Sequence, residues 1–453
     1  MVRLRDQAST VEGAGAVIER LSGEDLMQLA SDVGPVPWQV GAILLMDAGA
    51  DFDLSAATDV IAERIIAIPR LRQVLVRTSL GCGRPIWVDD AKFEVRQHVR
   101  SLTCELPGDE PALLQTAVAI ATERLPSHRP LWRATFITGL AGSRIALVVI
   151  FHHVLADGIG GLAVLANLVD AAPAARVVPF PRPAPSHRQL AADAFRTRLA
   201  ALRRLGAALS TLRQALTELN PAGAARAPTT TLNRPTGGQR RLAVTRVGLE
   251  NLRDLTREHD ATVNDVVLTA ISGALKRLLA RRGETVESLV ASVPVSARTS
   301  AAMADLGNRV GVMAVNLSVH RDPIERLERI AAITRAHKTT TRGASAALLG
   351  PVFRMLAAVG LMRWFTNRQR MVNFFVTNLR GPDRQLAFAG HRIIDVLPVT
   401  SIIGNVAMSF AVISYAGKLT VMIVADPEAQ PDVATLSTLL QHELDHLAAL
   451  RQS

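Results

Sequence analysis

The seven residues from His152 to Gly158 have the types and the order of a catalytic motif, His-His-Val-Leu-Ala-Asp-Gly. An apolar run at residues 144–151 predicts a β-strand directly before them, and a glycine-rich turn follows at residues 158–161. A strand that ends in two histidines beside an acid can present a base at the mouth of a cleft. A neutral imidazole, with an ordinary pKa of about 6.5, can accept a proton from a hydroxyl group at neutral pH. The motif therefore indicates general-base catalysis.

The geometry of a strand separates the two histidines. Neighbouring residues on a strand point to opposite faces, so one histidine is expected to face the cleft and the other the supporting core. This argues against a metal site made of His152, His153 and Asp157, which would need both imidazoles on one side. Asp157 is instead expected to pair with an arginine or to orient the imidazole. The alternative interpretation is a structural histidine pair followed by an Asp-Gly turn.

No nucleophile elbow accompanies the histidines. The sequence has no Gly-x-Ser-x-Gly motif, and neither Cys82 nor Cys104 lies in a context typical of a reactive thiol. With only two cysteines, a reducing interior is the simpler interpretation, although a single disulfide is not ruled out by the sequence. We therefore expect direct transfer, in which the histidine activates an acceptor hydroxyl that attacks an activated acyl group.

Composition and charge limit the class of protein and its partners. The chain has 453 residues, 49% hydrophobic and 20% charged, which is typical of a globular protein with two domains. The formal net charge is +11, but aromatic residues make up only 4% and no basic–aromatic motif occurs, so we do not expect a nucleic-acid partner. Anionic lipid surfaces or a phosphorylated carrier such as coenzyme A fit the charge better. A solvated basic surface without a partner is the alternative.

Strand-like and helix-like segments alternate along the chain. Strands or extended segments are predicted at residues 40–46, 86–88, 93–99, 144–151, 288–294, 373–377, 406–414 and 419–425, and helices at 56–68, 110–125, 161–169, 188–219, 264–281 and 434–450. A proline-rich stretch at residues 172–186 suits an extended connector. The pattern predicts an α/β protein with mixed sheets and two domains, at residues 1–170 and 241–453, joined by a linker at 171–240.

Two segments have membrane-related alternatives. The 188–219 helix carries leucines at three- and four-residue steps with arginines between them, so it either packs on its own protein or lies on a membrane surface. The apolar stretch at residues 346–365 is interrupted by Pro351, Arg354 and Arg363, and we interpret it as a buried or interfacial helix. The N-terminus does not resemble a signal peptide. We expect a cytoplasmic protein that is not secreted and that lies peripherally at the cytoplasmic membrane face or on lipid inclusions.

The whole chain resembles a known family. HHxxxDG is the signature of the acyltransferase superfamily that includes chloramphenicol acetyltransferase and peptide-synthetase condensation domains. Further stretches resemble one branch, the bacterial wax ester synthase/diacylglycerol acyltransferase (WS/DGAT) family. In chain order they are Leu21-Ser22-Gly23-Glu24-Asp25, Ile68-Pro69-Arg70-Leu71-Arg72, Arg129-Pro130-Leu131-Trp132, Asn264-Asp265, Gly307-Asn308-Arg309 and Thr377-Asn378-Leu379-Arg380-Gly381-Pro382. The resemblance runs from about Leu21 to the C-terminus.

The resemblance implies a role for each matching residue. His153 would be the general base, with His152 supporting it and Asp157 and Gly158 orienting the turn. Arg309 would be the structural partner of Asp157. The remaining implied roles are substrate binding for Asn264, Asp265, Pro130, Leu131 and Trp132, and structural support for Asn378 and Gly381. No metal and no resident cofactor are implied.

The family also implies a fold and a reaction. The fold would be two chloramphenicol-acetyltransferase-like domains with a long crossover and a reaction tunnel between them. The reaction would move a long-chain acyl group from acyl-CoA to diacylglycerol, giving triacylglycerol, or to a long-chain alcohol, giving a wax ester. The alternatives are a related acyltransferase that acts on a glycolipid, a polyketide alcohol or an amine, and a non-catalytic protein that binds acyl-CoA or lipid.

Two segments depart from the family pattern, and a third resembles the motif of a different family. Trp38 lies in Pro37-Trp38-Gln39-Val40 where the family usually has Pro-Met-His-Val, and Ser127-His128 replaces the usual Asp-Arg. These changes concern acceptor preference and catalytic rate. At the other end, residues 442–446 spell HExxH, the zinc-peptidase motif, but only seven residues follow and the leucine spacing is that of an ordinary amphipathic helix. We interpret this helix as structural.

Overall fold

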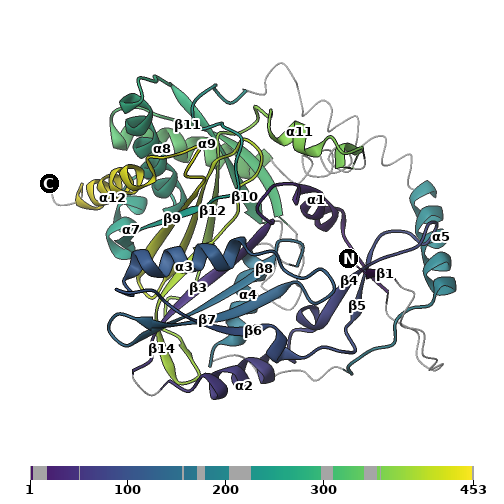
Figure 1. Ribbon diagram of the computed structural model, residues 1–453. Helices are drawn as coiled ribbons and strands as arrows, with labels where there is room; N and C mark the ends of the chain where they lie inside the picture. Colours follow the sequence, from purple (N-terminus) through teal and green to yellow (C-terminus); the bar gives the residue numbers. More distant parts are fainter. Residues whose placement is uncertain are drawn as a thin grey trace.

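The computed structural model has two six-stranded mixed sheets and a smaller four-stranded sheet, with helices on their outer faces (Figure 1). It describes residues 2–3, 18–49, 52–155, 158–170, 179–203, 226–296, 310–340, 355–357 and 359–450. The predicted α/β class with mixed sheets is confirmed. The described cysteines, Cys82 and Cys104, are buried free thiols rather than a disulfide.

The first large sheet has the strand order β13-β14-β3-β8-β7-β6. Its strands are β3 (Gln39–Asp47), β6 (Val99–Thr103), β7 (Trp132–Leu140), β8 (Arg144–His152), β13 (Ala387–Phe388) and β14 (His391–Val399). All pairs are antiparallel except β6 with β7. β8 is almost entirely buried because both of its faces are covered, which explains why its sequence is a continuous apolar run rather than an alternation.

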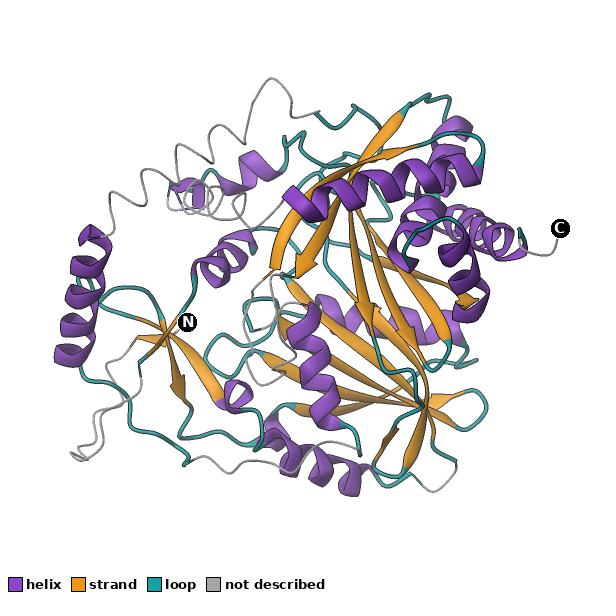
Figure 2. Cartoon of the chain, turned by 180° about the vertical axis from the view of Figure 1, so that it is seen from behind, coloured by secondary structure: helices purple, strands orange, loops and turns teal. Residues whose placement is uncertain are grey.

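The two faces of β8 pack against different layers. Leu147, Val149 and Phe151 face α2 (Leu54–Ile65) and α4 (Gly158–Leu168). Ala146, Val148 and Ile150 face α3 (Glu110–Thr122) and part of the second large sheet. The first sheet is therefore a middle layer at this point, and β8 is one of its two central strands (Figure 1). Figure 2 shows the strands and the helices that cover them from behind.

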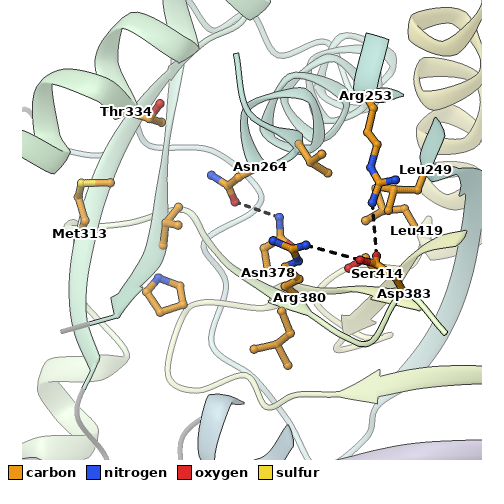
Figure 3. A pocket seen from close by; sticks show the side chains of 14 residues that line it. Leu249, Arg253, Asn264, Met313, Thr334, Asn378, Arg380, Asp383, Ser414 and Leu419 are labelled. Atoms are coloured by element: carbon orange, nitrogen blue, oxygen red, sulfur yellow. Dashed lines mark hydrogen bonds and ion pairs between the residues drawn. The ribbon is translucent and has the colours of Figure 1, made fainter. Parts of the chain in front are cut away.

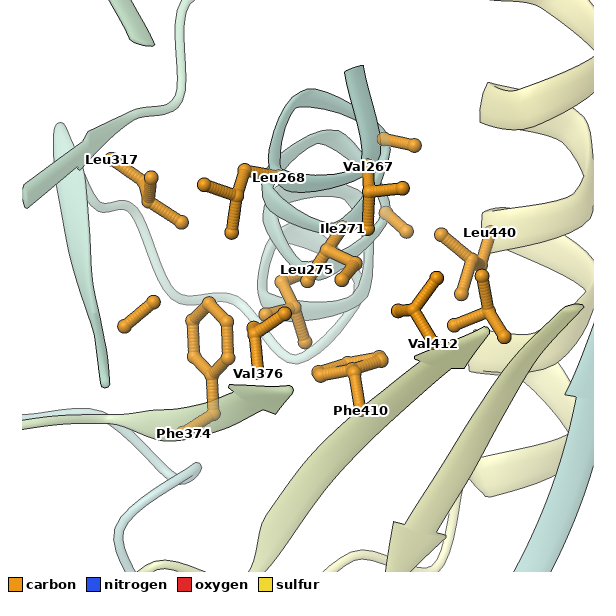
Figure 4. Packing of buried hydrophobic residues seen from close by; sticks show 14 of the residues in the cluster. Val267, Leu268, Ile271, Leu275, Leu317, Phe374, Val376, Phe410, Val412 and Leu440 are labelled. Carbon is orange, nitrogen blue, oxygen red and sulfur yellow. The ribbon is translucent and has the colours of Figure 1, made fainter. Parts of the chain in front are cut away.

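The second large sheet has the order β11-β10-β12-β15-β16-β9. Its strands are β9 (Arg241–Gly248), β10 (Ser288–Ser296), β11 (Val310–Ser318), β12 (Phe374–Arg380), β15 (Met408–Tyr415) and β16 (Lys418–Ala425). Helices α7 (Leu249–Glu258), α8 (Val263–Arg281), α9 (Pro323–Thr340) and α12 (Val433–Ala449) pack on it. Figure 4 shows α8 surrounded by apolar side chains, with Phe374 and Phe410 meeting edge to face at 5.6 Å between ring centroids.

The small sheet ties the beginning of the linker to the first half of the chain. Its strands are β1 (Val2–Arg3), β4 (Gln73–Arg77), β5 (Ile86–Asp89) and β2 (Glu19–Arg20), with the 3-10 turns η2 (Pro69–Arg72) and η3 (Val95–Gln97) nearby. Helix α5 (His187–Arg203) packs Leu190 on this sheet, and its Asp193 accepts a hydrogen bond from Arg20 at 2.7 Å. Residues 179–203 therefore belong structurally with the N-terminal part.

The division of the chain at residues 170 and 240 does not separate the two large sheets. β13 and β14 come from the C-terminal half, yet β14 pairs with the free edge of β3 along seven residue pairs. Asp170 holds the turn between β13 and β14 by accepting hydrogen bonds from the Ala389 and Gly390 amides and from Arg64. Pairing of β14 satisfies backbone groups that β3 would otherwise expose, which is why a distant segment completes this sheet.

Most of the predicted helices and strands are found within a few residues of their predicted bounds. Residues 93–98 are instead a loop that contains η3, and β6 starts only at Val99. Strands β7, β9, β11 and β14 were not predicted as strands. The 188–219 helix is described only as far as residue 203, and most of the 346–365 stretch lies outside the described residues, leaving the short helix α11 (Met362–Thr366).

The HExxH helix, α12, has a structural role. Glu443 is only 4% exposed and accepts a hydrogen bond from the buried Arg326, with Arg277 at 3.2 Å on its other oxygen. Gly273 of α8 permits this approach, since a Cβ there would lie 2.3 Å from the Glu443 carboxylate. His442 and His446 are exposed. The carboxylate is thus committed to two guanidinium groups rather than to a metal-bound water.

Removing this carboxylate should destabilise the second half of the molecule. We expect Glu443→Ala to lower the free energy of unfolding by about 3–5 kcal/mol, because Arg326 would remain buried without its partner. Denaturant unfolding of the purified variant measures this. Glu325→Ala is the control, since its pair with Arg329 is about half exposed and is worth at most about 1 kcal/mol. Equal effects of the two substitutions would contradict the structural role of Glu443.

Candidate active site

The histidine motif lies at the C-terminal end of β8, where the strand leaves the sheet. The His152 amide donates to the Leu131 carbonyl at 2.9 Å, and the His153 amide donates to the Trp38 carbonyl at 3.0 Å. The turn is therefore held from both sides, by the segment before β7 and by the segment before β3. His152 is buried, whereas His153 is partly exposed and lines a cavity. The prediction that the two histidines face opposite sides is confirmed.

Both ring nitrogens of His152 are occupied by the protein. Its Nδ1 accepts the Val154 amide at 3.1 Å, so the proton is assigned to Nε2, which lies 3.5 Å from a carboxylate oxygen of Asp32. An imidazole in this arrangement cannot also accept a proton from a substrate. The supporting role expected for His152 therefore has a physical basis in the hydrogen bond that shapes the turn.

Asp32, at the C-terminal end of α1 (Gly23–Ser31), joins the groups around the motif. Its carboxylate accepts hydrogen bonds from the Trp38 amide at 3.0 Å and from Arg124 at 2.8 Å, in addition to its contact with His152. Burial by itself raises the pKa of Asp32, but these partners outweigh it and lower the pKa to about 2. Asp32 is thus a charged anchor at neutral pH.

His153 lines a narrow cavity of about 60 Å³ between the two large sheets. The other lining residues are Val40, Gly41, Ala42, Phe151, Gly161, Leu162, Leu165, Thr377, Leu379, Pro398, Val399, Thr400, Ala411 and Ile413. Most of these side chains are apolar, and they come from β3, β8, α4, β12, β14 and β15, with Thr400 just after β14. Gly161 lets α4 approach closely, because a Cβ there would lie 2.4 Å from the Phe151 ring. The imidazole therefore borders a space with a mostly apolar lining.

A larger cavity of about 490 Å³ lies beside the N-terminus of α8 (Figure 3). Asn378 donates a hydrogen bond to Asn264 at 3.3 Å inside it, and Arg253 and Arg380 flank Asp383 at its edge. The remaining lining residues are Leu249, Val263, Val293, Pro294, Met313, Thr334, Leu379, Ser414 and Leu419.

Strand β12 contributes side chains to the walls of both cavities. Successive residues of a strand point to opposite faces, and accordingly Thr377 lines the His153 cavity while Asn378 lines the larger one. Leu379, near the end of β12, lines both. His153 and Asn264 therefore do not line the same cavity, but the two spaces adjoin at Leu379.

Several predicted substrate-binding residues have structural roles. Asp265 is buried and forms a capping box with Thr262 at the start of α8, and it also accepts a hydrogen bond from Thr334 at 2.7 Å. Its carboxylate is thus used within the protein and lines neither cavity. The third residue of a helix is a favourable capping position, and the substrate contact expected for Asp265 stays a prediction.

The segment Pro130-Leu131-Trp132 is also part of the scaffold. All three residues are buried, and the Leu131 carbonyl holds the His152 amide. The Trp132 indole donates to the Leu71 carbonyl at 2.7 Å and stacks on His98 at 4.7 Å between centroids. None of the three lines either cavity, and the substrate-binding role expected for them stays a prediction; they shape the site through the backbone.

Gly381 has the expected structural role, and two other predicted residues are not described. A Cβ at Gly381 would lie 2.3 Å from the Ser414 carbonyl, so only glycine allows β12 to approach β15 there. Gly158 begins α4. Asp157 and Arg309 lie outside the described residues, and their predicted pairing stays a prediction. In the described part of the chain, no three His, Cys, Asp or Glu side chains cluster closely enough to hold a metal ion.

Sequence reasoning missed the contribution of the segment before β3. Asp32 was not singled out, and Trp38 was noted only as a departure from the family pattern. Gln39 donates to the Ala121 and Glu123 carbonyls and accepts the Leu125 amide, joining β3 to the end of α3. The family pattern Pro-Met-His-Val, which aligns with residues 37–40, is the signal that could have pointed to this segment.

The fold is that of the condensation-type acyltransferases. It is similar to the wax ester synthase/diacylglycerol acyltransferase from Marinobacter aquaeolei VT8, with a TM-score of 0.68 at 23% identity, covering 95% of this chain and 100% of that one. It is also similar to the first condensation domain of the CDA synthetase, with a TM-score of 0.63 at 17% identity, covering 97% and 98%. At these identities the likeness concerns the fold.

Sequence comparison assigns the family. Residues 21–267 match the model of the wax ester synthase/diacylglycerol acyltransferase catalytic domain, and residues 306–448 match that of the WS/DGAT C-terminal domain. The chain is 31% identical to a probable diacylglycerol O-acyltransferase of Mycobacterium tuberculosis, covering 91% of each, and 29% identical to a putative one from the same species, covering 92% and 88%. The chain belongs to the WS/DGAT family and is an acyl-CoA-dependent O-acyltransferase.

Asp32 should contribute to stability in a pH-dependent way. Its pKa of about 2 in the folded protein lies below the ordinary 3.8, so its contribution is complete above 3.8 and is lost as the pH falls towards 2. We expect Asp32→Asn to lower the free energy of unfolding by roughly 2 kcal/mol at pH 7 and by progressively less at acidic pH. Denaturant unfolding over this pH range measures the effect. Asp59→Asn, at an exposed ion pair, is the control, and a difference that grows on acidification would contradict the assignment.

Proposed function

We propose that this protein transfers a long-chain fatty acyl group from acyl-CoA to diacylglycerol, giving triacylglycerol, and that it also accepts long-chain alcohols. The observation that carries the proposal is the position of His153, at a strand end facing an apolar cavity between two sheets. The curated relatives named as diacylglycerol O-acyltransferases support this acceptor.

In the proposed reaction, His153 accepts the proton of the acceptor hydroxyl as its oxygen attacks the thioester carbonyl. The resulting tetrahedral intermediate collapses by breaking the carbon–sulfur bond. The leaving thiolate takes the proton from the imidazolium, so the products are the ester and free CoA. No acyl-enzyme forms, and the imidazole returns to its neutral state.

The apolar lining supports long-chain substrates and protects the thioester from water. The larger cavity, with Asn264 and Asn378 inside it, adjoins the His153 cavity at Leu379. We propose that it takes up part of a substrate whose reacting end lies at His153. The backbone amides of Val154 and Leu155 are bonded to His152, so they are not the donors to a developing oxyanion.

The role of His153 can be tested by its loss. We expect His153→Ala to lower kcat about 10²–10⁴-fold with acyl-CoA and diacylglycerol, because the hydroxyl would lose its base. Release of free CoA and formation of triacylglycerol are the measurements. His442→Ala, at an exposed histidine of α12, is the matched control and should keep normal activity.

Circular dichroism and thermal unfolding should show that both variants stay folded. Full activity of folded His153→Ala would contradict the proposed base. A panel with diacylglycerol, hexadecanol, a glycolipid and an amine at fixed acyl-CoA then identifies the acceptor, and turnover of the amine alone would overturn the proposed acceptor class.

We further propose peripheral contact with an anionic lipid surface. In the described part of the chain, no helix is both long and apolar enough to span a bilayer. Exposed apolar side chains gather around α11, and this group, the α11 patch, consists of Met355, Val359, Leu361, Trp364 and Met371. Arg363, Arg368 and Arg370 are exposed beside it, and Arg368 lies over the Trp364 ring at 5.5 Å.

The charge around the α11 patch is of one sign. No acidic residue occurs between Glu328 and Asp383, whereas arginines recur through this stretch. Tryptophan and aliphatic side chains flanked by arginine are typical of a segment that lies in the interface of an anionic membrane. Helix α5 presents a second exposed apolar stripe, Phe195, Leu199 and Leu202, at helical spacing.

Vesicle binding tests the membrane proposal. We expect the double variant Leu361→Ser, Trp364→Ser to weaken binding to phosphatidylserine-containing vesicles by at least about tenfold in a sedimentation assay. The reason is that two apolar side chains that would enter the bilayer are lost. Binding of the unaltered protein should also weaken with salt. The control is Leu80→Ser, Leu106→Ser, two exposed leucines elsewhere. Equal loss in both double variants would contradict a specific contact surface.

A further inference from the structure

The ring of His153 is covered on one face by the indole of Trp38. The two rings are nearly parallel, with an interplanar angle of 9° and 5.5 Å between centroids. His153 also lines the cavity between the sheets, whereas Trp38 lines neither this cavity nor the larger one.

Trp38 is itself held at three points. Its backbone amide donates to Asp32 at 3.0 Å, its indole nitrogen donates to Gln28 at 2.8 Å, and its carbonyl accepts the His153 amide at 3.0 Å. Asp32 and Gln28 both come from α1 and its C-terminal cap. The short segment between α1 and β3 thus holds the indole against the imidazole.

We propose that Trp38 is a positioning residue of the acyl transfer, which sets the plane of the His153 ring so that its proton-accepting nitrogen meets the acceptor hydroxyl. Asp32 and Gln28 support it by holding the Trp38 backbone and indole. This inference rests on the proposed function of His153 as the base. Trp38 stands where the family usually has methionine. A methionine side chain has no flat surface on which the imidazole could stack.

A histidine ring that must accept a proton within hydrogen-bond distance loses rate when it rotates. The stacked indole restricts this rotation. It also favours the imidazolium formed during the reaction, since a cation within about 6 Å of an indole face is attracted by its π electrons.

The other described residues that line the His153 cavity, from β3, β8, α4, β12, β14, β15 and the segment after β14, carry no ionised side chain. The carboxylate of Asp32 contacts His152 and the Trp38 amide, and the guanidinium of Arg124 contacts Asp32. A change at Trp38 should therefore alter the environment of the His153 ring without removing a charge.

The test compares Trp38→Ala with Trp38→Phe in the full-length protein, using acyl-CoA and diacylglycerol. We expect Trp38→Ala to lower kcat about 10–100-fold, with little change in KM, because misplacement of the base affects the reaction and not the binding cavities. Trp38→Phe keeps an aromatic face and should retain most of the activity. In Trp38→Ala the acidic limb of the pH–rate profile should move to lower pH, because the imidazolium loses the indole face.

A spectroscopic readout separates positioning from general damage. In histidine ring ¹H–¹³C spectra, the signal that disappears in His153→Ala should be shifted upfield by the indole in the unaltered protein. That shift should be lost in Trp38→Ala and partly kept in Trp38→Phe, while thermal unfolding shows that the variants are folded. Gln28→Ala, which removes only the bond to the indole nitrogen, should give an intermediate decrease in kcat.

The outcomes distinguish the two proposals. If His153→Ala is fully active, the assignment of the base fails, whatever Trp38 does. If His153→Ala is inactive but Trp38→Ala keeps normal kcat and a normal pH profile, the positioning role of Trp38 is overturned and the base stands. Equal losses in Trp38→Ala and Trp38→Phe, with an unchanged ring signal, would also contradict positioning by stacking.

Discussion

The site depends on the burial of strand β8 from Ile145 to His152. Its two edges are paired with β3 and β7, and its two faces are covered by helices on one side and by α3 and the second sheet on the other. A strand enclosed in this way has no solvent-facing position for a polar group along its length. Only its end can present one, and the two histidines lie there. The apolar run allows the strand to be buried, and the motif that follows places the polar side chains at the end of the strand.

The two histidines at the end of β8 have different surroundings. His152 uses both ring nitrogens to hold the turn and to meet Asp32, whereas His153 faces the cavity. Because Asp32 also binds the Trp38 amide, one carboxylate connects the buried histidine, the stacked tryptophan and Arg124. His153, the proposed base, is thus supported by α1 and the start of β3, which are more than a hundred residues away in the sequence.

The cavity that His153 faces belongs to both halves of the chain. β14 extends the first sheet beyond β3, and β12 and β15 of the second sheet bring Thr377, Leu379, Ala411 and Ile413 to its wall. Glycine permits two close approaches near this cavity, that of α4 to Phe151 at Gly161 and that of the end of β12 to the Ser414 carbonyl of β15 at Gly381. The C-terminal half of the chain therefore completes both the first sheet and the cavity that His153 lines.

The sequence by itself determined the α/β class, the strand before His152, the separation of the two histidines and the family. These follow from local patterns: period-two geometry, apolar runs and a motif whose residues are neighbours in the chain. It assigned Asp265 and Trp132 to substrate binding, which stays a prediction, and it did not show that these side chains also take part in helix capping and in packing. Only the tertiary structure decided that β14 pairs with β3, that Trp38 covers His153 and that Asn264 lines a second, adjoining cavity. Those relations join segments far apart in the chain, and they are selected by the pairing of sheet edges and the packing of layers, which local sequence does not encode.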